Sequence, residues 1–327
     1  MTLPYFDAEA LATHLTPARA VAALEEALLG GQDPELDSPR LFAPLEAGEF
    51  LLMPAQSARY AGIKVATVAP GNPAKGHPKI QGTYLLLDRS TLTPLAAMDG
   101  AELTLIRTPA VTTLAIKHLL AIRGAASAGV VTVLGTSLQA DRHIEAIHAV
   151  CGISELVVIG RRAEAADALA LKWAGRGIPS RAGVAQDVAT ANVVVCATSS
   201  VTPVFDGRLI ADNAIVAAIG SHGLDAREVD PILALRAEVV VEGVASALRE
   251  AGDLIPARSA AQWKDRGLCT LSELVTGRFG PVAGSRCCTR ALACPGKTLW
   301  LPGGRLRFST MLTPKYTKIS YCSATLH

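Results

Sequence analysis

The stretch from Val130 to Ile147, VVTVLGTSLQADRHIEAI, contains residues whose types and spacing could bind a dinucleotide. Gly135 and Ala140 hold the first and last places of the pattern G-x-G-x-x-G/A, while Ser137 stands at the second glycine. A small residue there still lets the N–H groups of a helix N-terminus approach a pyrophosphate. We predict that the helix begins at Gln139; the alternative is a strand-to-helix turn that binds nothing. The predicted cofactor contacts in this turn are Gly135, Thr136, Ser137, Leu138 and Gln139.

The end of the next predicted strand, ELVVIG, bears on which dinucleotide is bound. An acid there would accept a hydrogen bond from the ribose 2′-hydroxyl of NAD, but the chain reads Gly160-Arg161-Arg162, with no acid before Glu164. Two guanidinium groups suit a 2′-phosphate, and without such a ligand they oppose the helix dipole. The sequence therefore favours NADPH, with NADH as the weaker cofactor; the alternative is a solvated basic helix start. Further predicted cofactor contacts are Gly160, Arg161, Arg162 and Thr198.

The composition limits the classes of protein to which the chain can belong. It has 327 residues, 50% of them hydrophobic, and a formal net charge of +2, which gives no reason to expect a nucleic-acid partner. The opening MTLPYFDAEALATHL lacks the basic start and apolar run of a secretion signal, and no run of about 18 apolar residues occurs. No metal-binding spacing is visible. We expect a cytoplasmic protein with no membrane or nucleic-acid partner.

The alternation of predicted strands and predicted helices indicates the fold class. From about residue 125, strands such as GVVTVLG, ELVVIG, ANVVVCAT and NAIVAAIG alternate with helices, which is typical of a parallel, doubly wound sheet, and AEVVVEG (237–243) is a further predicted strand. Before that, LFAPLEAGEFLLMP predicts a hairpin, and residues 100–124 predict a long helix that Pro109 kinks or breaks. We predict an α/β protein with a mixed α/β domain at 1–115, a Rossmann-type domain at 116–270 and a returning C-terminal segment at 271–327.

The end of the chain differs in composition from the rest. Cys287 to His327 contains four of the seven cysteines and several Lys and Arg residues, but no Asp or Glu. From about residue 285 the segment is atypical and looks like translation in a shifted reading frame. The alternative is a genuine variable extension.

Several stretches, in order along the chain, resemble the ornithine cyclodeaminase/μ-crystallin family. They are SPRLFAPL, FLLMPA, GIKVATVAPGNPAKGHPKIQGTYLLLD, PLAAMDGAELTLIRTPAVTTLA, LGTSLQADRHIEAI and AIGSHGLDAREVD, and together they extend over about residues 1–280. The resemblance implies a homodimer. In it, the first domain and the returning C-terminus would bind substrate and form the dimer contact, with a nicotinamide-binding domain between them.

The resemblance also assigns roles to single residues. Arg40 and Lys64 would bind a substrate carboxylate, Arg107 would meet the substrate or the cofactor phosphates, and Lys64 or His222 would handle the proton. Judged by residue type alone, Lys64 in an apolar strand needs a partner or a function, whereas Arg40 and His222 could equally be surface and loop residues. The site residues that the resemblance implies are Arg40, Met53, Lys64, Arg107, Thr108 and His222.

Two departures from the family pattern help to choose among its reactions. The cyclodeaminases carry an acid where this chain has Leu51, and a catalytic aspartate where it reads Gly220-Ser221-His222. An amine must be deprotonated before it releases a hydride, so the loss of both acids disfavours deamination. The resemblance then implies NADPH-dependent reduction of 1-pyrroline-2-carboxylate or 1-piperideine-2-carboxylate to L-proline or L-pipecolate. The alternatives are an NAD-dependent ornithine cyclodeaminase or alanine dehydrogenase, or a non-catalytic, crystallin-like protein that binds NADPH or another ligand.

Overall fold

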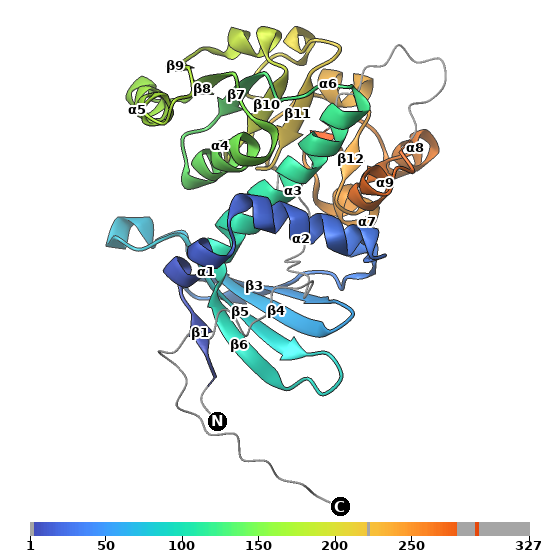
Figure 1. Cartoon of the computed structure of the whole chain (residues 1–327). Coiled ribbons are helices and arrows are strands. Elements are labelled where there is room, and N and C mark those ends of the chain that lie inside the picture. Colours follow the sequence, from blue (N-terminus) through green and yellow to red (C-terminus); the bar gives the residue numbers. More distant parts are fainter. Residues whose placement is uncertain (1–2, 221–222, 280–291, 294–327) are drawn as a thin grey trace, which may run out of the picture.

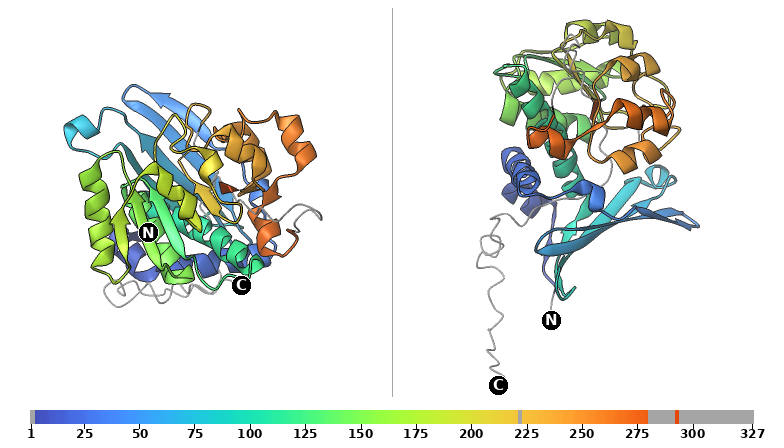
Figure 2. Two further views of the ribbon diagram at one scale, coloured as in Figure 1. Left: turned by 90° about the horizontal axis from the view of Figure 1, so that it is seen from above. Right: turned by 90° about the vertical axis from the view of Figure 1, so that its right-hand side faces the viewer.

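The computed structural model describes residues 3–220 and 223–279, and the backbone of residues 292–293. These form two lobes, each built on a six-stranded sheet and joined by the long helix α3 (Gly100–Ile122) (Figures 1 and 2). The predicted domain boundary between residues 115 and 116 falls inside α3, which contacts strands of both sheets. The division of the chain into domains therefore stays a prediction.

The lower sheet in Figure 1 is built from strands of the first hundred residues. Its order is β1-β6-β5-β4-β3-β2, antiparallel except for the β1–β6 pair, and the expected hairpin is β2–β3. Because side chains alternate, one face carries Lys64 and Tyr84, and the apolar part of that face packs against α1 (Ala8–His14) and α3. The strands are β1 (Tyr5–Phe6), β2 (Leu41–Leu45), β3 (Gly48–Gln56), β4 (Tyr60–Val68), β5 (Ile80–Asp88) and β6 (Pro94–Asp99).

Helix α3 is the central element of the molecule. Its first turn is capped by the Asp99 carboxylate, which accepts hydrogen bonds from the N–H groups of Ala101 and Glu102. The helix continues through Pro109, so the break considered there does not occur. Among the described helices, only α3 is long and apolar enough to cross a membrane, but 67% of its apolar window is buried inside the protein, as in a core helix.

The upper sheet confirms the doubly wound parallel fold. Its order is β9-β8-β7-β10-β11, with β14 beyond β11, and every neighbouring pair is parallel. The strand order reverses beside β7, and ligands of such sheets bind at the carboxyl ends of the strands near this reversal. The strands are β7 (Val130–Leu134), β8 (Glu155–Ile159), β9 (Ser180–Ala182), β10 (Val193–Cys196), β11 (Ile215–Ala218) and β14 (Leu292–Ala293).

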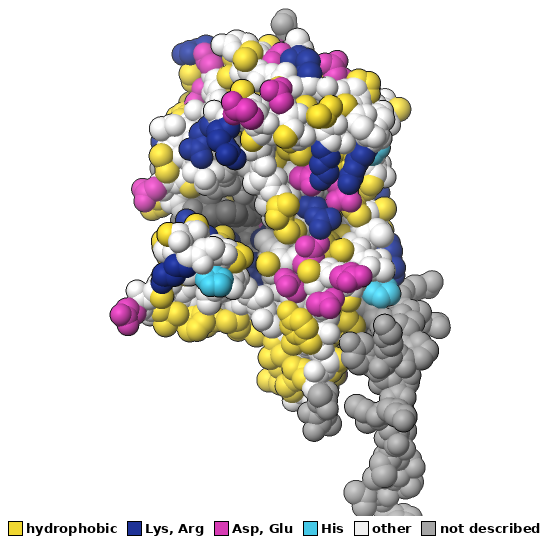
Figure 3. All heavy atoms as spheres, turned by 90° about the vertical axis from the view of Figure 1, so that its left-hand side faces the viewer, with side chains coloured by type: hydrophobic (Ala, Val, Ile, Leu, Met, Phe, Trp, Pro, Cys, Tyr) yellow, Lys and Arg dark blue, Asp and Glu magenta, His cyan; other side chains and the backbone are white. Residues whose placement is uncertain are grey.

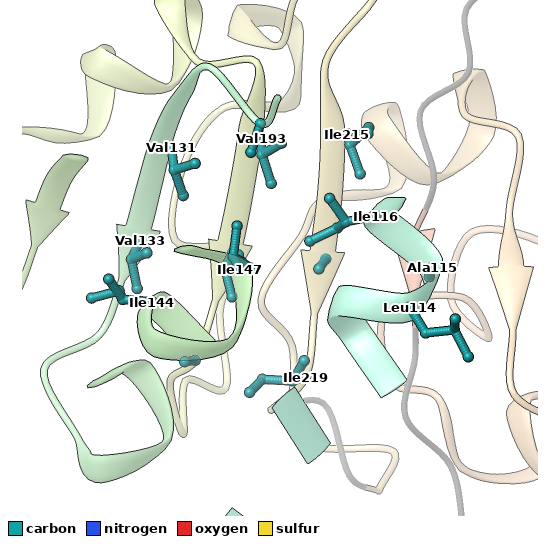
Figure 4. Packing of buried hydrophobic residues seen from close by; sticks show 14 of the residues in the cluster. Leu114, Ala115, Ile116, Val131, Val133, Ile144, Ile147, Val193, Ile215 and Ile219 are labelled. Atoms are coloured by element: carbon teal, nitrogen blue, oxygen red, sulfur yellow. The ribbon is translucent and has the colours of Figure 1, made fainter. Parts of the chain in front are cut away.

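Helices α3, α4 (Leu138–Cys151) and α5 (Ala163–Ala174) pack against the upper sheet. Ile144 and Ile147 of α4 lie against strand residues such as Val131 and Val193, and Ile116 of α3 lies beside β11 (Figure 4). These strands carry apolar side chains on both faces because helices cover both faces, which explains their continuously apolar sequences.

The segment 237–243 departs from its prediction as a strand of the doubly wound sheet. Only β12 (Val240–Val241) forms, and it pairs with β13 (Cys269–Thr270) in a separate two-stranded parallel sheet. The chain then leaves the ladder at Glu242 and enters α7 (Val244–Glu250). An apolar run predicts a buried strand but does not reveal which sheet it joins. The remaining α-helices of the described ranges are α2 (Pro17–Leu29), α6 (Pro231–Arg236), α8 (Ala260–Arg266) and α9 (Leu271–Val275).

The returning C-terminal segment begins with α9, which contacts α2 and α3. The atypical tail lies outside the described residues except for β14, so its shifted-frame interpretation stays a prediction.

The His143 imidazole, fully buried between α4 and α3, should make stability depend on pH. Its Nδ1 donates to the Gln139 carbonyl (2.7 Å), so its Nε2 accepts from the Thr112 hydroxyl (3.2 Å), and burial lowers the pKa of His143 to about 4. Because this pKa is below that of the unfolded chain, the unfolded state binds more protons between about pH 6.5 and about pH 4, and stability falls as the pH falls through this range.

We expect urea unfolding to show that wild type loses about 2 kcal/mol more than His143→Gln between about pH 7 and about pH 5. An equal loss in both proteins would contradict a neutral, buried imidazole. His148, on the same helix but not fully buried, provides the control variant His148→Gln, which should follow wild type.

Candidate functional site

The candidate site lies where the two lobes meet. Figure 3 shows the surface hollowed between them, with Lys and Arg side chains on both edges of the hollow. Thr104 of α3 connects the two sides, because its hydroxyl accepts from Lys64 Nζ of the lower sheet (3.2 Å) and its carbonyl accepts from Gln139 Nε2 of the upper lobe (3.4 Å). The predicted substrate residues and the predicted cofactor turn are therefore neighbours.

The predicted cofactor turn is a tight connection between β7 and α4. Gly135 has a φ of +124°, and a Cβ there would lie 2.4 Å from the carbonyl oxygen of Ala197, so no other residue fits. Ser137 is the N-cap of α4, and its hydroxyl accepts from the N–H of Ala140 (3.5 Å). Helix α4 therefore begins at Leu138, one residue earlier than predicted, because the serine hydroxyl caps it. The side chain of Leu138, the first residue of α4, is exposed.

Several buried polar atoms on α3 and at the start of α4 have no hydrogen-bond partner among the described residues. Phosphate oxygens are acceptors that would match the donors in this set and the open N–H groups of α4. An unpaired buried donor costs about 1–3 kcal/mol, so the Arg107 guanidinium and the Thr108 hydroxyl would be stabilised by an anionic ligand, whereas Gln139 Oε1 is an acceptor and would not bind a phosphate oxygen. The atoms are Nε and Nη1 of Arg107, Oγ1 of Thr108 and Oε1 of Gln139.

The basic pair directly follows β8, the strand beside β7. A Cβ on Gly160 would lie 2.8 Å from Thr136 Cγ2, so the glycine lets the two loops approach each other. Arg161 and Arg162 are both exposed, and neither is ion-paired to a residue in the described ranges. Arg162 is the N-cap of α5 without a side-chain cap bond. Both guanidinium groups are thus free to meet an anionic ligand.

Lys64 occupies an unusual position for a charged side chain. It lies in the middle of β4, in register with Met53 of β3 and Tyr84 of β5, and only 6% of it is exposed. Burial, together with the nearby charges of Arg107 and Arg40, lowers the pKa of Lys64 to about 7. The ammonium and the free amine are therefore both populated near neutral pH, as suits a group that exchanges a proton.

The two arginines lie near carboxylates from the second half of the chain. Arg40, just before β2, forms an ion pair with Glu250 at the end of α7 (Nε–Oε2, 3.0 Å). Arg107, on α3, is buried and lies within the electrostatic reach of Glu242. Burial raises the pKa of Glu242 to about 8, although Arg107 and Arg40 lower it.

Glu242 was not anticipated from the sequence. Its only signal in the sequence was an acid at the end of the apolar run AEVVVEG. An acid at the end of a predicted strand needs no functional explanation. The structure brings together Arg40, Met53, Lys64 and Arg107 on one side of Thr104, and the cofactor turn on the other. Thr198, at the end of β10, donates to the carboxylate of Glu228. His222 lies outside the described residues, so its role stays a prediction.

Known proteins share this arrangement of lobes. A model of the ornithine cyclodeaminase/mu-crystallin family matches residues 8–280. The chain belongs to this family. Among family relatives, the Δ1-pyrroline-2-carboxylate/Δ1-piperideine-2-carboxylate reductase of Azospirillum brasilense is 35% identical over 287 residues, which cover 85% of this chain and 87% of the reductase.

Solved structures agree with the family assignment. An archaeal alanine dehydrogenase dimer with bound NAD is 26% identical and has a TM-score of 0.78, with 90% of each chain covered. The Δ1-pyrroline-2-carboxylate reductase of Thermococcus litoralis, in complex with NADH and L-proline, has a TM-score of 0.80 over 91% of this chain and 93% of its own. At 23% identity, this second likeness concerns the fold alone.

Replacing Lys64 should stabilise the protein. The folded pKa of Lys64 lies below that of an unfolded lysine, so burying the ammonium reduces stability by its full amount below about pH 7, and by less as the pH rises from there towards about 10.5. We expect Lys64→Met to raise the free energy of unfolding by about 1–3 kcal/mol at neutral pH. Chemical denaturation measures this value.

A matched control is Lys117→Met on α3. The Lys117 ammonium is half-exposed and paired with Glu25 (2.6 Å), so its removal should bring no gain in stability. A loss of stability in Lys64→Met would instead mean that the folded protein stabilises the Lys64 ammonium, which contradicts the cost of burying it.

Proposed function

We propose that this protein reduces a cyclic ketimine carboxylate, 1-pyrroline-2-carboxylate or 1-piperideine-2-carboxylate, to L-proline or L-pipecolate, with NADPH as the preferred cofactor. The observation that carries the proposal is the buried Lys64, which shares Thr104 with the cofactor turn. Its support from relatives is the 35% identity to a reductase named for these two imines.

The charges of the site suit a single substrate carboxylate. Arg40 has Glu250 as a partner and Arg107 has Glu242 nearby, whereas Lys64 is bonded to the neutral Thr104 hydroxyl and has no carboxylate partner among the described residues. A substrate carboxylate beside Lys64 would supply the missing negative charge. Its electrostatic attraction is strong there because the side chain is buried away from water.

Lys64 also suits the proton transfer. A cyclic imine becomes a good hydride acceptor when its nitrogen is protonated, and an ammonium with a pKa of about 7 gives up its proton readily at neutral pH. When bound, a reduced nicotinamide supplies the hydride that the imine carbon accepts. The buried position of Lys64 under α3 keeps water away from the ammonium, so the proton passes to the substrate.

The residues that would hold the cofactor extend along the carboxyl edge of the upper sheet. The N-terminus of α4 and the unpaired atoms of Arg107 and Thr108 fit the pyrophosphate. Arg161 and Arg162, exposed and unpaired at the end of β8, fit a 2′-phosphate. This last pair is the reason for preferring NADPH.

The function is tested by following NADPH oxidation with 1-pyrroline-2-carboxylate, and with NADH in its place. We expect turnover with both cofactors and a higher kcat/KM with NADPH. Release of ammonia from ornithine with NAD would instead establish a cyclodeaminase, and turnover of alanine an alanine dehydrogenase. Tight NADPH binding without any turnover would establish the non-catalytic binding protein.

The cofactor preference is tested by Arg161→Asp. A carboxylate at this place repels a 2′-phosphate and can accept from a 2′-hydroxyl, so we expect the KM for NADPH to rise by about 100-fold while that for NADH changes little. Arg19→Asp, which makes the same charge change at an exposed position of α2, should leave both values unchanged. Equal losses with both cofactors in Arg161→Asp would refute the preference for NADPH.

The lower sheet supports a homodimer. The face opposite Lys64 is apolar yet half-exposed, with Leu52 and Val65 paired across β3–β4 and Ile63 and Leu85 paired across β4–β5. Figure 3 shows hydrophobic side chains gathered over this lower lobe. An apolar sheet face of this kind is typical of a contact with a second copy, and the related archaeal alanine dehydrogenase is a dimer.

We expect Leu85→Glu to yield monomers in sedimentation equilibrium, because it places a charge in the middle of this face. Leu171→Glu makes the same change on α5 at a leucine that is 74% exposed, and should leave the dimer intact. A wild-type protein that sediments as a monomer would overturn this assignment.

A further inference from the structure

Glu228 is a fully buried acid for which the proposed chemistry has no role. It lies between β11 and α6, and the two oxygens of its carboxylate bind different segments. Oε1 accepts from the N–H (2.6 Å) and the hydroxyl (2.7 Å) of Thr198, and Oε2 accepts from the N–H of Gly220 (2.6 Å). One side chain therefore joins the chain just after β10 to the chain just after β11.

The two segments that Glu228 joins are in very close contact. A Cβ on Gly220 would lie 1.9 Å from the carbonyl oxygen of Thr198, so position 220 accepts only glycine at this separation. Neighbouring parallel strands are held by their ladder only as far as their ends, which here are Cys196 and Ala218. Beyond these residues, the carboxylate of Glu228 maintains the spacing of the two loops.

Glu228 is itself fixed from behind. Its own N–H and that of Val229 donate to Asp253 Oδ1 (2.7 and 2.9 Å), and its carbonyl accepts from the N–H of Val204 (2.9 Å). All three groups that face its carboxylate are donors, so the ionised form is the one that satisfies them, even though burial raises the pKa of Glu228. A carboxylate with these anchors is a rigid, preformed support.

The strand order indicates which part of a dinucleotide lies beside this support. The basic pair follows β8 and the pyrophosphate turn follows β7, whereas Thr198 and Gly220 follow β10 and β11 on the other side of β7. A dinucleotide whose adenosine half lies at β8 and whose pyrophosphate lies at β7 must extend its nicotinamide half towards β10 and β11.

We propose that Glu228 is a positioning residue for the nicotinamide half of the cofactor, which it serves by holding the loops after β10 and β11 at a fixed separation. The inference rests on the proposed use of a nicotinamide dinucleotide. Glu228 does not touch the cofactor; it acts through Thr198 and Gly220. Its loss should therefore affect ligands that contain the nicotinamide ring and spare those that lack it.

The test compares two probes by isothermal titration calorimetry: NADP⁺ and 2′-phospho-ADP-ribose, which lacks the nicotinamide ring. In Glu228→Gln, an NH₂ group replaces one carboxylate oxygen and faces a group that donated a hydrogen bond to that oxygen. Two donors then oppose each other, so one of the two loops loses its hydrogen bond to residue 228. We expect the Kd for NADP⁺ to rise at least about tenfold while the Kd for 2′-phospho-ADP-ribose stays unchanged. In steady-state assays, kcat should fall while the KM for the imine is retained.

Asp230→Asn is the matched control. The Asp230 carboxylate also joins two segments, accepting from the N–H groups of Gly207 and Leu233 (2.8 Å each), and neither residue belongs to the proposed cofactor site. This variant should lose thermal stability to a similar degree but keep both affinities. If Glu228→Gln fails to fold, Glu228→Asp keeps the charge with a shorter reach and should show the same selective loss of NADP⁺ affinity.

Equal weakening of the two probes in the Glu228 variants would mean that the residue supports the fold only, and unchanged affinities would mean that it positions nothing. Either result overturns the inference. The proposed function fails in a different way. If the wild type binds both probes but does not reduce the imine with NADPH, the proposed function is overturned, and the Kd values for the two probes can still be compared between wild type and the Glu228 variants. A wild type that binds neither probe overturns both.

Discussion

The hydrogen bond from Lys64 to Thr104 is the interaction on which the site depends. It places an ammonium group in the middle of an antiparallel strand, under the first turns of α3, where water does not compensate for its charge. The same burial that reduces the stability of the fold lowers the pKa of Lys64 to about 7 and strengthens its attraction to an anion. A free lysine on the surface would have neither property, so the position of the side chain, rather than its type, makes it a candidate for catalysis.

Helix α3 transmits this constraint to the cofactor side. Thr104 binds Lys64 through its hydroxyl and Gln139 through its carbonyl, and Glu102, two residues earlier, binds Arg142 of α4 (2.8 Å). The relative position of the lower sheet and the α4 N-terminus is therefore fixed by two side chains and one carbonyl group on a single turn of helix. A substrate held by Lys64 and a dinucleotide held at α4 must then lie side by side, which is the geometric requirement for transfer between them.

The sequence predicts those parts of the molecule that depend on local patterns. Continuously apolar strands alternating with helices predict the parallel sheet, and Gly135 predicts a turn that only glycine can form. Capping is also local, but Ser137 was treated as a substituted glycine, and its role as the N-cap that begins α4 at Leu138 was missed. The start of the helix was therefore placed one residue late.

Features that depend on distant contacts could not be predicted in this way. The pairing of β12 with β13 depends on tertiary position, because two-residue strands carry no pattern of their own. Glu242 and Glu228 are single acids in apolar or loop segments. Their value to the site arises from Arg107 and Thr198, which are far away in the sequence, and from Gly220, which the chain reaches only through the loop after β11. Only the fold brings such acids to their partners.

The most direct test of the central claim is the pH dependence of kcat/KM for 1-pyrroline-2-carboxylate in wild type and in Lys64→Arg. If the Lys64 ammonium binds the carboxylate and supplies the proton, kcat/KM of wild type is highest below about pH 7 and falls about tenfold per pH unit above it, as the ammonium is lost. Arginine stays charged, so the variant, although less active, should lack this fall. A wild-type profile that is flat to about pH 9, or one that Lys64→Arg reproduces, would contradict the role of Lys64.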